Sequence, residues 1–289
     1  MMLYDMMIAP FVDFVFMRRA LVGCIALSLS CAPIGVFLVL RRMSLMGDAL
    51  SHAVLPGAAV GFILGGLSLP VLAMGGLIAG LLVALLAGIV SHYTQLNEDA
   101  SFAGFYLLSL AIGVLLVSKW GSSVDLTHIL FGSVLAVDAT SLILVASVTT
   151  ITLIWFAYCY RGFVVECVDR LFLQATTGNG LRYHLGFVFL TTLNLVAGFQ
   201  ALGTLMAVGL MMLPAASARL IAHSLGGTLS LAVLLALVAS IGGLIVSFQF
   251  DVSSGPAIIV FAGLMYILAL VFAPKGWLGR RQSKHHLRG

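Results

Sequence analysis

Residues 49–97, ALSHAVLPGAAVGFILGGLSLPVLAMGGLIAGLLVALLAGIVSHYTQLN, contain no Asp, Glu, Lys or Arg over 49 positions. A helix that crosses a bilayer needs about 20 apolar residues, so this run can cross twice and must fold back on itself. In lipid the backbone has to bond internally, which indicates helices. The alternation of polar and apolar residues that is typical of a membrane β-barrel is missing. The stretch therefore predicts an all-α membrane protein.

The rest of the 289-residue chain has the same character, with 62% hydrophobic and only 8% charged residues. A soluble domain carries about 25% charged residues and could not hide so much apolar surface. We predict one polytopic helical bundle over residues 1–289, with eight to ten spans. The spans are expected near residues 20–40, 49–66, 70–91, 101–119, 139–160, 184–200, 202–219, 228–247 and 256–273. Residues 126–137 are too short to cross and are expected to be re-entrant, and 202–219 to be a short or broken crossing.

Basic residues lie in the segments that flank these spans, although the net charge is only +4. This placement indicates orientation in a membrane rather than nucleic-acid binding. The tail 275–289 and the loop 161–182 are both rich in basic residues, so both are predicted to be cytoplasmic. Residues 1–19 then form an interfacial lead on the periplasmic side. The chain is expected to be a multi-pass inner-membrane protein in contact with lipid.

Asp48 and His52 are four residues apart and therefore share one face of a predicted helix. If Ser44 caps that helix, they lie about 6 Å and 12 Å inside it. Ionisable groups at such depth usually face a cavity or a pathway. A carboxylate and an imidazole together suit Zn²⁺ or Mn²⁺. The spacing fits equally an internal Asp–His hydrogen bond that ties helices together.

Glu98 and Asp99, at the start of the predicted span 101–119, are weaker metal candidates because helix capping explains them as well. The remaining candidates have ordinary explanations at span ends, in loops or in the tail: Asp125, His128, His184, His223, His285 and His286. The metal prediction therefore depends on Asp48 and His52.

The loop segment ECVDRLFLQATTGNG, residues 166–180, predicts a short helix that Asp169 caps and Gly178 ends. Such a helix exposes Leu171, Phe172 and Leu173 to the cytoplasm, where apolar side chains favour a partner surface. The alternative is that they pack against the helix ends of this same protein.

Several enzyme motifs do not occur in the sequence. There is no GxxxxGK[ST] phosphate loop, so the chain is not expected to bind ATP itself. There is no HExxH and no GxSxG, which leaves a zinc protease or a serine hydrolase without support. We predict a protein that is not an enzyme.

The stretch LRRMSLMGDALSHAVLPG, residues 40–57, closely resembles the signature of permeases from zinc/manganese ABC importers. The resemblance covers about residues 20–273, in the expected order. The other stretches that carry it are NEDAS 97–101, LFG 130–132, QALGTL 200–205, LPAASAR 213–219 and SGPA 254–257. The lead and the histidine-bearing tail lie outside it.

This resemblance implies a homodimeric permease with an architecture like that of the vitamin B12 importer. It implies a cytoplasmic ATPase subunit and a periplasmic metal-binding protein as partners. Asp48 and His52 match the family's metal pathway, and the loop matches its coupling helix, here Asp169, Arg170, Leu171, Phe172 and Leu173. The expected cargo is zinc, with manganese or iron as alternatives, and no permanently bound cofactor. The rival from another class is an ATP-independent secondary metal transporter.

Overall fold

The computed structural model describes residues 9–66, 68–94, 96, 98–120, 138–168, 180–275 and 277. Within these residues all regular elements are helices: α2 (Ala9–Asp13), α3 (Val15–Leu40), α4 (Ser44–Ala53), α5 (Leu55–Gly65), α6 (Leu69–Tyr93), α7 (Glu98–Trp120), α9 (Ala139–Val168), α11 (Gly180–Leu202), α12 (Thr204–Ile221), α13 (Leu225–Phe250) and α14 (Ser254–Phe272). Over the same ranges, nine spans are long and apolar enough to cross a membrane, with α4 and α5 forming one of them. The predicted all-α bundle of eight to ten spans is confirmed.

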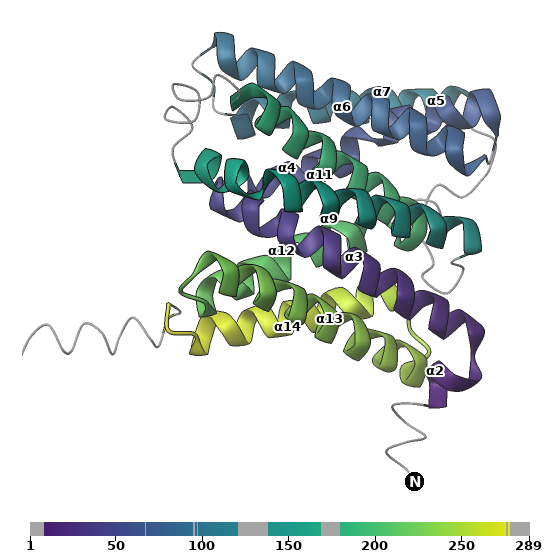
Figure 1. The fold of residues 1–289 in the computed structure, drawn as a ribbon. Coiled ribbons are helices and arrows are strands. Elements are labelled where there is room, and N and C mark those ends of the chain that lie inside the picture. Colours follow the sequence, from purple (N-terminus) through teal and green to yellow (C-terminus); the bar gives the residue numbers. More distant parts are fainter. Residues whose placement is uncertain are drawn as a thin grey trace, which may run out of the picture.

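The helices stack in layers, with α5, α6 and α7 on one side and α13 and α14 on the other (Figure 1). The long helix α3 runs through the middle and packs on α9, α11, α12 and α13. It carries much of the core, including Leu27, Ile34 and Phe37. Outward faces of α6, α7, α9 and α14 expose large apolar side chains such as Leu86, Leu115, Ile154 and Leu268, as a surface in contact with lipid requires.

Glycine is required at two places in the bundle, one a close helix contact and the other a turn. Gly57 of α5 and Gly75 of α6 face each other so closely that a Cβ on Gly75 would lie 2.3 Å from the Gly57 carbonyl oxygen. Gly203 has φ 94° and is the single residue between α11 and α12. Because that φ disfavours residues with a Cβ, glycine allows the chain to reverse there in one step.

The helix ends differ from the predicted ones in three ways. Helix α3 begins at Val15, so Arg18 and Arg19 lie inside it. Helix α9 continues to Val168 and α11 begins at Gly180, so both ends of the predicted loop 161–182 are helical. Ser44 is the first residue of α4 and not its cap, a position held by Met43 without a side-chain hydrogen bond.

Two further predictions concern the short segments 202–219 and 126–137. The segment near 202–219 is an unbroken helix of 18 residues, α12, with Pro214 inside it. The predicted re-entrant segment 126–137 lies outside the described residues.

We call the end of the bundle where α3, α9 and α14 finish its tail end (Figure 1). Lys275, just after α14, donates a hydrogen bond there to the carbonyl of Ala222, which follows α12. A cation at a helix C-terminus interacts favourably with the helix dipole. Lys275, the first residue of the predicted basic tail, thus lies at the end of the bundle where the α3–α4 turn also lies.

Candidate metal pathway

The span that carries Asp48 and His52 is broken in the middle. Helix α4 ends at Ala53 and α5 begins at Leu55, with Val54 at the junction. Pro56 has no backbone N–H and so cannot donate to the carbonyl of His52, four residues earlier. The N–H of Val54 bonds to the carbonyls of His52 and Leu50 at this junction. The break therefore changes the backbone hydrogen bonding of the residue that carries the imidazole.

Asp48 and His52 lie on one face of α4, as their spacing predicts. The Oδ1 atom of Asp48 is 3.7 Å from Nε2 of His52, and the two side chains are 59% and 39% exposed. A separation of 3.7 Å is longer than a hydrogen bond, so the lone pairs of both groups remain partly open to a third group. An exposed carboxylate within a membrane span is costly when it faces lipid, so this face favours water or another protein surface.

Helix α7 supports this face from one side. The ring of Tyr106 stacks on that of His52, with centroids 6.1 Å apart and an interplanar angle of 27°. One turn further along, Ser109 Oγ donates to the carbonyl of Ala53 over 3.2 Å. Gly113 then lies against Pro56, where a Cβ would be 3.1 Å from the proline nitrogen. Helix α7 thus contacts both the His52 imidazole and the junction between α4 and α5.

The two weaker candidates begin this supporting helix. Glu98 is the first residue of α7 and Asp99 the second. Because Tyr106 lies beside His52, Asp99 is about one turn closer to the tail end than Asp48. Asp99 is half-buried. The structure thus brings the start of α7 next to the start of α4, while a metal role for Glu98 and Asp99 stays a prediction.

Other sequence candidates do not join this pair. His223 is exposed in the turn between α12 and α13. Among the described residues, no cluster of three or more His, Cys, Asp or Glu side chains could hold a metal ion. The predicted coupling residues Asp169 to Leu173 lie outside the described residues, as do Asp125, His128, His285 and His286.

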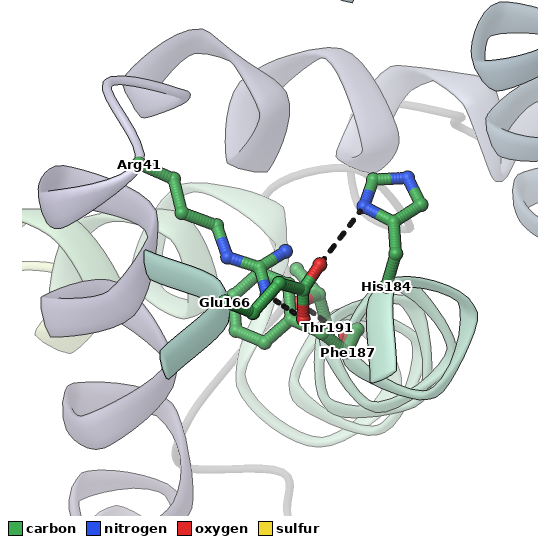
Figure 2. A network of polar contacts seen from close by, with 5 residues as sticks. All are labelled: Arg41, Glu166, His184, Phe187 and Thr191. Carbon is green, nitrogen blue, oxygen red and sulfur yellow. Dashed lines mark hydrogen bonds and ion pairs between the residues drawn. The ribbon is translucent and has the colours of Figure 1, made fainter. Parts of the chain in front are cut away.

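A second polar cluster, at the tail end, was not predicted from the sequence. A guanidinium nitrogen of Arg41 lies 2.6 Å from Oε2 of Glu166, and Nδ1 of His184 lies 3.7 Å from Oε1 of the same carboxylate. Figure 2 shows the carboxylate between the other two groups. All three side chains are buried. His184 is expected from the sequence only to flank a span end, and the wide spacing of the three residues along the chain gives no signal of contact.

Comparisons with known proteins show the family to which the chain belongs. The family model described as the ABC 3 transport family matches residues 13–273. A manganese transport system membrane protein from Halalkalibacterium halodurans is 33% identical over 276 residues, covering 93% of each chain. A chelated iron transport system membrane protein from Yersinia pestis is 32% identical and covers 94% of this chain and 90% of its own.

The fold also matches a solved structure, PsaBC from Streptococcus pneumoniae in complex with Fab. The TM-score is 0.82 at 33% identity, with 94% of this chain and 97% of that chain covered. The likeness thus extends over nearly the whole bundle.

Proposed function

Since this chain belongs to the ABC 3 transport family and is a permease of a metal ABC importer, we propose that its cargo is Mn²⁺, which passes Asp48 and His52. The observation that carries the proposal is the pair itself, 3.7 Å apart on one open face of a broken span. Oxygen ligands suit Mn²⁺, and imidazole serves several divalent ions. The carboxylate of Asp48 supplies an oxygen ligand and His52 an imidazole.

The relatives reported above favour manganese or iron over zinc. They are named for manganese and for chelated iron, and none of them for zinc. The expectation of zinc from the sequence therefore has no support, and manganese takes its place with iron as the second candidate. Iron is favoured by one specific observation, the likeness to the Yersinia pestis protein over most of both chains.

A second copy of the chain completes the pathway in this proposal. Two side chains fill only part of the shell of an ion such as Mn²⁺, which takes about six ligands. The Asp48 side chain is 59% exposed in one copy, in a span where lipid contact is unfavourable. A homodimer would cover this face and bring two Asp–His pairs to a shared path.

ATP hydrolysis belongs to a separate cytoplasmic subunit in this proposal, and an external metal-binding protein delivers the ion. Membership in an ABC importer family supports these partners over an ATP-independent secondary transporter. Binding of ATP would rock the spans, which opens the path first to one side and then to the other. The predicted coupling residues 169–173 would contact the ATPase.

The cargo is tested in cells that lack this gene, grown with manganese, iron or zinc limiting. We expect the gene to restore cellular manganese, measured by elemental analysis, and excess Mn²⁺ to compete best for uptake. A variant of the partner ATPase without hydrolysis should abolish the effect. Restoration of zinc alone would overturn the manganese proposal, and uptake that persists without ATP hydrolysis would overturn the ABC mechanism.

A further inference from the structure

Three helices that are distant in sequence meet at the tail end of the bundle in one buried cluster. Arg41 directly follows α3, Glu166 lies in the last turn of α9, and His184 is in the second turn of α11. Figure 2 shows the three side chains converging from these elements, with Phe187 below the guanidinium. We call Arg41, Glu166 and His184 the tail-end cluster.

The contacts within this cluster are short and shielded from water. The Arg41–Glu166 ion pair is 2.6 Å long, and the exposed fractions of the two side chains are 8% and 2%. The guanidinium carbon of Arg41 lies 4.2 Å from the centre of the Phe187 ring. Charge-assisted bonds of this kind are directional, and buried ones lock the parts that carry them. The ends of α3, α9 and α11 are thus fixed to one another.

The position of the cluster in the chain connects it both to the predicted coupling segment and to α4. Residues 169–179, which include the predicted coupling residues, connect the helix of Glu166 to the helix of His184. Arg41 is three residues before Ser44, the start of α4, and seven before Asp48. The cluster therefore joins both stems of the predicted coupling loop to the turn that leads into the metal-binding helix.

That turn is itself rigid. Arg42 has φ 60°, the left-handed conformation that ends many helices. Its N–H bonds to the Val39 carbonyl over 3.2 Å, and the N–H of Met43 bonds to the Leu38 carbonyl over 3.0 Å. This pair of bonds is the Schellman motif. A displacement of Arg41 would therefore move the start of α4 with it, because few free torsions lie between them.

We propose that the tail-end cluster is the link through which movement of the coupling segment reaches α4 and its Asp48–His52 pair. The inference rests on the proposed function, since it requires an ATPase that moves residues 169–179. Packed interiors switch between discrete arrangements rather than deform continuously, so a locked contact transmits a shift that a loose one absorbs. Arg41 and Glu166 act here as positioning residues and do not touch the metal.

The test uses the permease with its ATPase and the metal-loaded binding protein in proteoliposomes. Glu166→Gln keeps the shape of the side chain and removes its charge. We expect ATP hydrolysis to continue while Mn²⁺ uptake per ATP falls about tenfold, a typical effect on coupling. Mn²⁺ binding to the purified complex should be unchanged, because Asp48 and His52 are intact. Arg41→Lys keeps a cation at this position, so its Mn²⁺ uptake per ATP should fall less than that of Glu166→Gln.

A fold-preserving variant and a matched control separate transmission from simple stabilisation. The double variant Arg41→Met with Glu166→Met removes the whole ion pair, a change that is often neutral for stability. Thr152→Val removes a different buried polar contact of α9, the 2.7 Å bond that Asn194 of α11 donates to Thr152. We expect the double variant to lose coupling and Thr152→Val to keep it.

The outcomes also separate this inference from the proposed function. Uptake per ATP that stays normal in Glu166→Gln and in the double variant would overturn the link. Equal loss of coupling in Thr152→Val would do the same, because it would mean that the loss of any buried polar contact on α9 suffices. If the unmodified complex moves no Mn²⁺ under ATP, the proposed function fails instead.

Discussion

Glu166 binds Arg41 across 125 positions of sequence, with 2.6 Å between Oε2 of the carboxylate and a guanidinium nitrogen. Glu166 lies in the last turn of α9, and Arg41 lies at the turn into α4, the helix that carries Asp48 and His52. A buried pair that loses one member leaves an uncompensated charge, which destabilises by about 3–5 kcal/mol. This contact therefore fixes the tail end of the bundle, whatever further part it has in transport.

The first prediction concerns the metal pair. Asp48→Asn and His52→Gln should each lower Mn²⁺ uptake by more than about tenfold, since loss of even an outer-shell partner weakens metal affinity about 10- to 100-fold. Uptake is measured in cells that lack the native gene. The matched control is His223→Gln, an exposed histidine in the α12–α13 turn, which should transport normally. Normal uptake by both site variants would favour an Asp–His contact that is only structural.

The second prediction concerns Tyr106, whose ring stacks on His52 at 6.1 Å. Aromatic pairs contribute about 0.5–1.5 kcal/mol, so Tyr106→Leu should raise the KM for Mn²⁺ by about 2- to 10-fold with less change in maximal rate. Tyr106→Phe keeps the ring and should behave like the unmodified protein. Equal effects of Phe and Leu would mean that the hydroxyl group, and not the stacking, matters.

The third prediction concerns membrane sidedness. Cysteine is placed at Ser283 in the tail, or at the exposed Ser68 between α5 and α6, in a chain whose Cys159 and Cys167 are replaced by Ala. An impermeant thiol reagent should label Ser68→Cys in intact spheroplasts and Ser283→Cys only in inverted vesicles. The buried Cys24 and Cys31 should not react in either case. The reverse pattern would overturn the orientation and, with it, the side of the coupling loop.

The fourth prediction concerns the contact with the ATPase. Each apolar side chain buried in a partner contributes about 1.5–3 kcal/mol, or about one to two powers of ten in affinity. Replacing Leu171 and Phe172 by Ser should therefore reduce co-purification of the ATPase, while Mn²⁺ binding at Asp48 and His52 persists. A double variant that retains its ATPase and transports normally would mean that the loop packs on its own helix ends.

The fifth prediction concerns the close contact between α5 and α6. Gly75→Ala would place a Cβ 2.3 Å from the Gly57 carbonyl oxygen, which forces the helices apart. Overpacking of this kind lowers stability by about 1–3 kcal/mol, visible as a lower Tm in detergent. Gly88→Ala on the same helix has open space around it and should be neutral or slightly stabilising. Equal Tm values for the two variants would contradict the close contact.

Local features of the sequence were enough for the fold class and for the shared helix face of Asp48 and His52. Long uncharged runs require lipid, and lipid requires helices, so an all-α bundle follows from composition alone. The spacing between Asp48 and His52 places them on one helix face, because a helix repeats about every 3.6 residues. The resemblance around residues 40–57 indicated a metal importer, and it leaned toward zinc where the relatives' names favour manganese or iron.

Contacts between distant segments were decided by the tertiary structure alone. Examples are the stacking of Tyr106 on His52, the bond from Ser109 to Ala53, and the meeting of Arg41, Glu166 and His184. In a soluble protein an apolar stripe marks the face of a helix that packs inward. In a membrane, lipid and protein interior are both apolar, so the apolar stripe of a helix is weak. The face on which each helix packs is instead set by the fit of side chains from all its neighbours.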